Sequence, residues 1–239
     1  MGIISVQGAN WGVGSSTIAA NLAAAHTDLH QRVLIIEADS RNLMGMWFGR
    51  HEHPDIGWAP HYAVNQRWQE GLYKSPLGTY FLPFGTAALS SLELLNALQS
   101  MLVTARERFE HTIVLLPNQF DGKQLAHLVD LPLVVVNPSP GTVTLLARQL
   151  VEQQYATRTR YVLNMCRYNA RIARELTLIL EDMLGSKLLS SYVCFDLALQ
   201  ESVAALSNIL AKAPKSQSCG EFRQLASLTL SQLEQLNQA

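Results

Sequence analysis

Charged side chains are scarce in this 239-residue chain. Asp, Glu, Lys and Arg together make up 15% of it, and the formal net charge is −1, whereas about 25% of the residues in a typical soluble domain are charged. Lys and Arg form neither a basic run nor a basic tail, and the phosphates of nucleic acids require such clusters. The composition therefore excludes nucleic acid as an expected partner. It also suggests that other proteins cover part of this thinly charged surface.

Cysteines and long apolar runs are scarce as well. Cys166, Cys194 and Cys219 are far apart in the sequence and odd in number, which fits reduced structural thiols in the cytosol better than disulfides or a zinc site. No Lys or Arg precedes Arg32, so the basic region of a signal peptide is missing. No apolar run approaches the roughly 18 residues of a membrane span. We expect a cytoplasmic protein without direct membrane insertion.

Short apolar segments alternate with helical stretches along the whole chain. The expected strands are residues 3–6, 33–36, 79–82, 113–116, 133–136 and 161–163, and the expected helices are 16–27, 90–109, 142–153, 172–184, 197–210 and 221–236. Because the strand segments are continuously apolar rather than alternating, both faces of each strand should be buried. This pattern predicts one α/β domain over residues 1–239, a three-layer sandwich with a mostly parallel central sheet.

Residues 50–76 differ from the rest of the chain. They set aromatic and histidine side chains among Pro and Gly: His51, His53, Trp58, His61, Tyr62 and Trp68. Interface cores favour Trp and Tyr over Lys and Glu, so we interpret the segment as an insertion and a partner contact surface. The alternative is that these aromatic side chains fold inward, because a loop this long needs a core of its own. The histidines lack the spacing of a metal site.

The strongest motif lies between the first expected strand and the first expected helix. It reads Gly8-Ala9-Asn10-Trp11-Gly12-Val13-Gly14-Ser15-Ser16-Thr17. Glycines allow successive backbone N–H groups to converge on phosphate oxygens, and the helix N-terminus behind them adds partial positive charge. We therefore assign the phosphate cradle to Gly12, Val13, Gly14, Ser15, Ser16 and Thr17. The hydroxyl of Ser16 lies where it would meet Mg²⁺.

This loop resembles the deviant Walker A motif, K-G-G-x-G-K-[ST]-[ST], of the MinD and ParA class of P-loop proteins. In that alignment Asn10 and Ser15 replace the two lysines, and Trp11 replaces a glycine. The lysines provide positive charge for the transferred phosphate, so the resemblance implies very slow hydrolysis or none. The indole of Trp11 could close over the pocket or cap a base, and the sequence leaves both open.

Other segments resemble the same class. Glu37 and Asp39 fall at the acidic positions of its D-x-D motif, where Asp39 would orient the attacking water, here as a vestige. Leu115 replaces the Walker B aspartate that helps to hold Mg²⁺. Asn164 falls at the adenine-contacting position, and Asp196, with Glu201 and Pro214, falls in the segment after the last core strand. The resemblance implies ATP or ADP with Mg²⁺, or a protein that has lost its nucleotide.

Within that class the chain resembles the BcsQ family of cellulose biosynthesis. The resemblance rests on the loop Gly12–Thr17 and on Asn42-Leu43, Gly57-Trp58-Ala59, Trp68, Gly71-Leu72-Tyr73 and Leu82-Pro83-Phe84-Gly85. It implies an accessory protein that assembles or regulates the inner-membrane cellulose synthase and secretion complex in biofilm-forming bacteria. The protein would work at the inner-membrane face or the cell pole, as a homodimer or as a hetero-oligomer with a small Bcs accessory protein.

Two other functions stay open at this point. One is a slow ATP-dependent switch that dimerises, and the other is a cell-positioning protein of the MinD/ParA type. A protein that cycles on membranes would need a basic amphipathic C-terminal helix, whereas residues 227–236 contain no Lys or Arg. We expect this helix to pack on the fold.

Overall fold

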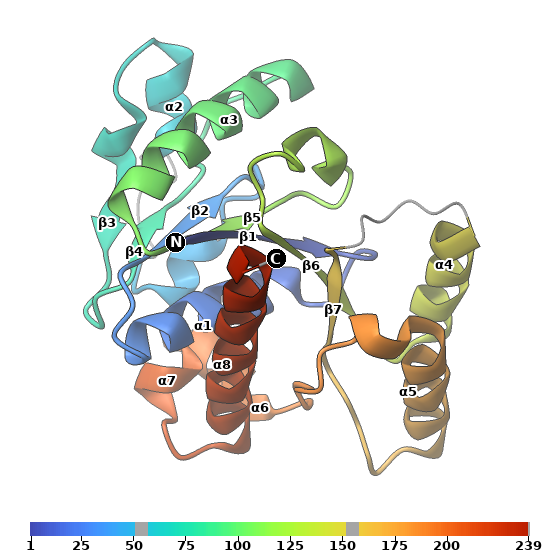
Figure 1. The fold of residues 1–239 in the computed structure, drawn as a ribbon. Helices are drawn as coiled ribbons and strands as arrows, with labels where there is room; N and C mark the ends of the chain where they lie inside the picture. Colours follow the sequence, from blue (N-terminus) through green and yellow to red (C-terminus); the bar gives the residue numbers. More distant parts are fainter. Residues whose placement is uncertain (51–56, 152–157, 239) are drawn as a thin grey trace.

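The structure is a computed structural model that describes residues 1–50, 57–151 and 158–238. Its centre is a seven-stranded sheet with the order β3-β4-β2-β5-β1-β6-β7 (Figure 1). The strands are β1 (Gly2–Gly8), β2 (Val33–Glu37), β3 (Tyr73–Lys74), β4 (Tyr80–Leu82), β5 (His111–Leu115), β6 (Leu131–Val136) and β7 (Arg160–Leu163). Only the β3–β4 pair is antiparallel among them. The expected mostly parallel sheet is confirmed.

Helices cover both faces of this sheet (Figure 1). One face carries α1 (Ser15–Asp28), α6 (Leu197–Ala204), α7 (Ile209–Lys212) and α8 (Gln217–Gln238). The other carries α2 (Trp58–Ala63) and α3 (Ser91–Arg108) over β2, β4 and β5, and α4 (Pro140–Val151) and α5 (Arg171–Leu184) over β6 and β7. Short 3₁₀ turns are η1 (Met44–Trp47), η2 (Trp68–Gly71), η3 (Gly122–Leu125) and η4 (Gly185–Lys187). The three-layer sandwich is therefore confirmed.

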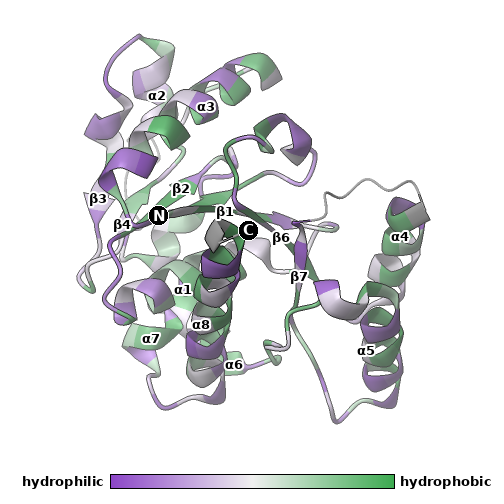
Figure 2. Cartoon of the chain, viewed as in Figure 1, coloured by the Kyte–Doolittle hydropathy of each residue, from purple (hydrophilic) through white to green (hydrophobic). Residues whose placement is uncertain are grey.

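The strands hold the layers together because their side chains are buried on both sides. In β1, Ile4 and Val6 pack under α1, while Ile3 packs toward α3. Fully burying one such aliphatic side chain contributes about 1.5–3 kcal/mol. Figure 2 shows the consequence for the outer layers, where α3, α5 and α8 carry both hydrophilic and hydrophobic residues. Each of these three helices buries one face and exposes the other, whereas α1 is buried almost all round.

The C-terminal helix α8 packs on the fold, as expected from the absence of Lys and Arg in residues 227–236. Phe222, Leu225 and Leu233 belong to the same buried cluster as α1. Within residues 1–50, 57–151 and 158–238, no helix has the length and apolar character required to cross a membrane.

The expected single helix over residues 197–210 is wrong. The chain leaves α6 after Ala204, and Leu206 adopts a positive φ of 54°. Asn208 then caps α7, because its Oδ1 accepts a hydrogen bond from the N–H of Ala211 at 3.1 Å. Asn and Ser favour caps over helix interiors. Ser207-Asn208 therefore marks the start of a second helix, which the continuous apolar pattern over residues 197–210 did not indicate.

The aromatic side chains of residues 57–76 turn inward, which corrects the interpretation of this segment as a contact surface. Trp58 is 0% exposed, and its indole N–H donates to the carbonyl of Glu37 at 2.7 Å. The ring also packs edge-on against Phe84, while Trp68 and Tyr62 lie half-buried against the same core. His51 and His53 lie outside the described residues. The segment forms its own core against β2 and β4.

Two of the cysteines meet in space although they are far apart in the sequence. Cys166 and Cys194 form an isolated parallel bridge between backbone segments, and all three cysteines are free thiols. Burial is the main cause that raises the pKa of Cys166 and of Cys194 to about 12. Such thiols stay protonated at neutral pH and are poor nucleophiles.

Candidate functional site

The glycine loop connects β1 to α1 in a conformation that only glycine adopts easily. Gly12 and Gly14 have φ values of 79° and 87°, in the left-handed region that costs other residues energy. Gly14 is the N-cap of α1 and provides no side-chain hydrogen bond to the first turn. The backbone N–H groups of that turn therefore lack a side-chain acceptor, which is the arrangement that favours an anion.

The residues at the two lysine positions do not bring positive charge to the loop. Asn10 donates through Nδ2 to the hydroxyl of Thr142 at 3.2 Å, which ties it to the start of α4. That hydroxyl in turn donates to Asn137 at 2.5 Å. Ser15 is buried in the first turn of α1. Both positions are occupied by neutral side chains that pack within the protein.

Asn164, at the end of β7, holds the loop from the other side. Its Nδ2 donates to the carbonyl of Val13 at 2.8 Å, and the side chain is buried. A side chain at position 14 would collide with the same Nδ2. Asn164 therefore fixes the loop in the described structure, and its expected contact with adenine stays a prediction.

Asp196 caps α6 with both carboxylate oxygens engaged. Oδ1 accepts from the N–H of Ala198 at 2.9 Å, and Oδ2 accepts from the hydroxyl of Ser218 at 2.8 Å. These contacts give Asp196 a structural role at the wall of the site. Glu201 is exposed on α6.

A cavity of about 440 Å³, named the base cavity below, contains the residues that the sequence analysis expects to lie near an adenine base. It brings Thr17 of the loop together with Asn164 and Asp196. Its other walls, which sequence reasoning missed, are Trp47, Met165, Cys194, Phe195, Leu199, Gln200, Val203 and Ala204. A mostly apolar cavity with a few polar groups is typical of a small-molecule site. No local motif marks these wall residues, because they come from three separate segments.

Two acidic residues lie at the carboxyl end of β2, Glu37 as its last residue and Asp39 just beyond it. Glu37 is buried and accepts from the N–H groups of Leu43 at 2.7 Å and Met44 at 3.0 Å. Burial is the largest cause that raises the pKa of Glu37 to about 7. This carboxylate organises the turn after β2, which carries Asp39.

Asp39 is paired with Arg41 instead of standing free to orient a water. The guanidinium Nε lies 3.1 Å from Oδ1 and 2.9 Å from Oδ2, and one terminal nitrogen lies 2.6 Å from Oδ2. The hydrogen bond to Asp39 is the first cause that raises the pKa of Arg41. The same guanidinium lies 5.3 Å from the ring centre of Trp11. Trp11 is 61% exposed and is not among the residues that line the base cavity.

Leu115 occupies the strand position at which the motif calls for an aspartate. It is buried in the core, in register with Val6 of β1 and Glu37 of β2. At the position that the sequence analysis assigns to a Walker B aspartate, the structure holds a buried apolar side chain. Among the described residues, no group of three or more His, Cys, Asp or Glu side chains could hold a metal ion.

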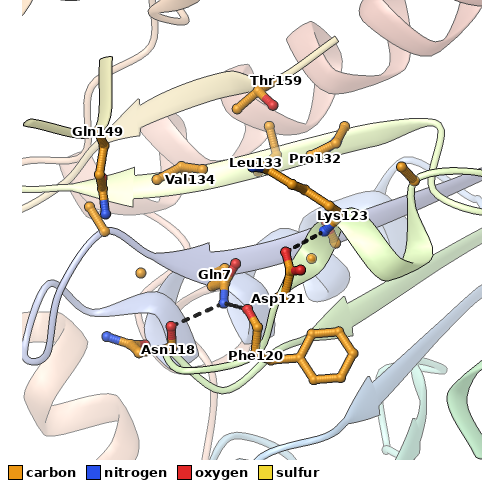
Figure 3. A pocket seen from close by; sticks show the side chains of 15 residues that line it. Gln7, Asn118, Phe120, Asp121, Lys123, Pro132, Leu133, Val134, Gln149 and Thr159 are labelled. Atoms are coloured by element: carbon orange, nitrogen blue, oxygen red, sulfur yellow. Dashed lines mark hydrogen bonds between the residues drawn. The ribbon is translucent and has the colours of Figure 1, made fainter. Parts of the chain in front are cut away.

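A second cavity, of about 310 Å³, lies behind the start of the loop (Figure 3). Gln7 of β1 forms one of its walls and donates through Nε2 to the carbonyls of Pro117, Asn118 and Phe120, at 2.8, 3.2 and 2.7 Å. These bonds join the segment after β5 to the strand that carries the loop. Gln7 therefore fixes the segment after β5 against β1, and no motif in the sequence indicated this role.

Comparison with solved structures places this fold among known proteins. Pyrococcus furiosus cell division ATPase MinD superposes with a TM-score of 0.77 at 21% identity, over 98% of this chain and 99% of that chain. MinD from Pyrococcus horikoshii, solved with Mg-ADP, gives 0.77 at 17% identity over 95% of each chain. The ParA family ATPase from Chlorobium tepidum gives 0.73 at 19% identity, over 94% and 98%. The fold is that of the MinD/ParA class of P-loop proteins.

Within that class the sequence identifies one family. The family model described as "Cellulose biosynthesis protein BcsQ" matches residues 1–230, and this chain belongs to the BcsQ family. The BcsQ protein of Escherichia coli K12 is 28% identical over 150 residues, which cover 57% of this chain and 59% of that protein. The Salmonella typhi protein is 32% identical over 102 residues, 43% of this chain and 41% of that protein.

Proposed function

We propose that this protein is an accessory factor of a bacterial cellulose synthase and secretion complex that binds an adenine nucleotide without hydrolysing it at a useful rate. Its family membership supports the role in cellulose synthesis. The proposed absence of hydrolysis rests on the neutral side chains of Asn10, Ser15 and Leu115, which stand at the positions of two lysines and an aspartate in the related motifs. Without those charges, the negative charge of the phosphoryl transition state lacks its usual partners.

Retained binding of ATP or ADP is supported by the parts of the site that need no lysine. Backbone N–H groups at the start of α1 can cradle phosphates, and the cavity of about 440 Å³ beside Thr17 and Asn164 is large enough for a base. The hydroxyl of Ser16 would hold Mg²⁺ through the nucleotide, and the metal would neutralise phosphate charge when bound. The nucleotide would then act as a structural ligand that stabilises one conformation.

Association at the edge that carries the loop is supported by its exposed apolar side chains. Trp11 follows β1 and Leu43 follows β2, while Leu197 begins α6 shortly after Cys194, whose backbone bridges Cys166 just beyond β7; all three side chains are exposed. The carboxyl ends of parallel strands meet at one edge of a sheet, so these three residues lie near the same edge. We propose a homodimer or a hetero-oligomer with a small Bcs accessory protein there, at the cytoplasmic face of the inner membrane.

The test combines turnover with cellulose output. We expect the purified protein to release phosphate from Mg-ATP no faster than a protein-free blank. In cells that lack the endogenous gene, the wild type and Asp39→Ala should restore cellulose to the same level, because no hydrolysis is required. Gly14→Val should fail, since its side chain collides with Asn164 and distorts the loop.

Two results would contradict the proposal. Phosphate release above the blank that disappears in Asp39→Ala would establish a slow switch ATPase. Normal cellulose output with Gly14→Val, in protein that circular dichroism shows to be folded, would mean that the loop has no part in the function.

A further inference from the structure

Arg41 connects the turn after β2 to the phosphate loop. Its guanidinium holds both carboxylate oxygens of Asp39 and faces the ring of Trp11, 5.3 Å from the ring centre. Trp11 immediately precedes Gly12 in the loop. A cationic side chain is therefore already positioned beside a loop that carries none at its two lysine positions.

Arg41 is free to change partners in a way that Asp39 is not. The Arg41 side chain is 45% exposed, whereas the Asp39 side chain is 8% exposed. Water reaches the exposed guanidinium and screens part of its attraction to Asp39. Asp39 would keep a donor after the guanidinium left, since its Oδ1 accepts from the backbone N–H of Arg41 at 3.0 Å. The guanidinium can therefore leave without removing every hydrogen bond of the buried carboxylate.

We propose that Arg41 replaces the missing loop lysine by moving its guanidinium from Asp39 to the terminal phosphate of a bound nucleoside di- or triphosphate. This inference rests on the nucleotide binding proposed above and adds the residue that recognises the phosphate. Guanidinium matches phosphate oxygens in a two-pronged geometry, and a terminal phosphate carries more negative charge than the single charge of Asp39. Trp11 can keep its stacking contact during the exchange and so guide the side chain toward the loop.

If Arg41 moves from Asp39 to the phosphate, Asp39 and the nucleotide compete for the same guanidinium. Removing the guanidinium should weaken nucleotide binding, while removing the charge of Asp39 should strengthen it. A structural role of the Asp39–Arg41 pair predicts something different, because both substitutions would then disturb the same turn and weaken binding together. The opposite signs therefore distinguish phosphate recognition from turn stability.

The experiment is calorimetric titration of the full chain with ATP, ADP and adenosine in the presence of Mg²⁺. We expect Arg41→Gln to weaken ATP binding about tenfold or more, as the loss of a charge-assisted hydrogen bond implies, and to leave adenosine binding unchanged. Asp39→Asn should bind ATP more tightly than the wild type. Its amide oxygen can still accept the backbone N–H of Arg41.

The matched control is Arg223→Gln. Arg223 forms a similar half-exposed ion pair, with Nε 2.7 Å from Asp28 at the far end of α1, and its substitution should leave all three affinities unchanged. Arg41→Lys provides a second variant if Arg41→Gln fails to fold, because it keeps the charge and should lose less affinity.

Each other outcome overturns the inference in a recognisable way. Unchanged ATP affinity in Arg41→Gln, with a wild type that binds ATP, would show that Arg41 only closes the turn. Equal weakening in Arg41→Gln and Asp39→Asn would assign the pair to loop structure. A wild type that binds no nucleotide at millimolar concentration would refute the proposed nucleotide function as well, and with it this role of Arg41.

Discussion

At the scale of single residues, the tryptophans show how differently one residue type is used. Trp58 is fully buried and hydrogen-bonded to the backbone of Glu37, while Trp11 stands exposed on the loop. We expect Trp58→Ala to destabilise the protein by about 3–5 kcal/mol, because it leaves a cavity in the core. Trp11→Ala, as the matched control, should cost about 1 kcal/mol or less. Urea unfolding measures both, and similar losses would contradict the burial of Trp58.

Glu37 is a buried carboxyl whose titration should be visible in stability. Its pKa is about 7 in the folded protein, against 4.5 for the free side chain, so the folded state binds the proton more tightly than the unfolded state. The contribution of Glu37 to the stability of the fold should therefore fall as the pH rises from about 4.5 to 7. Glu37→Gln removes this contribution, so the stability of the variant should increase relative to that of the wild type as the pH rises through this interval, which urea unfolding at a series of pH values would show. An unchanged pH profile would mean that Glu37 titrates normally.

At the scale of elements, the break between α6 and α7 depends on one cap. Asn208 accepts from Ala211 and donates to the carbonyl of Trp47 at 3.4 Å. We expect Asn208→Ala to cost about 1–2 kcal/mol, and Asn208→Ser, which keeps an acceptor oxygen, to cost less. Thermal or urea unfolding checks the order. Equal losses in the two variants would show that the cap does not determine where α7 begins.

The elements also show what the sequence could predict. The six expected strands lie within about two residues of β1, β2, β4, β5, β6 and β7, because buried parallel strands are continuously apolar. The two-residue strand β3 and the burial of Trp58 could not be predicted, since β3 depends on its pairing with β4 and Trp58 on its packing in the core beneath α3. The glycine loop could be found as a sequence motif. The hydrogen bonds of Asn164 to Val13 and of Arg41 to Asp39 could not, because they join residues through the folded structure. The sequence shows which residue types a motif contains, whereas tertiary contacts decide which partner each side chain binds.

At the scale of the whole molecule, two sets of buried groups oppose each other in their response to pH. Burial lowers the pKa of His26 to about 3 and lowers that of His111, whose ring meets His26 edge-on. The folded state then binds fewer protons than the unfolded state, so these histidines reduce stability as the pH falls below about 6.5. Glu37 acts in the opposite direction between about pH 4.5 and 7. The stability of the whole protein should change little across that interval and fall more steeply below it.

The hydrogen bond from Asn164 to the carbonyl of Val13 gives the molecule a further property. Asn164 also lines the base cavity, whereas Val13 belongs to the phosphate loop. One side chain therefore touches two places that, in the proposed function, would recognise different parts of one nucleotide. Any occupant of the cavity that draws this amide away changes the free energy of the loop, and by reciprocity an anion on the loop changes the affinity of the cavity to the same degree. If the protein binds a nucleotide as proposed, the two halves of the site are thermodynamically linked, and the affinity of the whole nucleotide should differ from the simple sum of the affinities of its base and its phosphates.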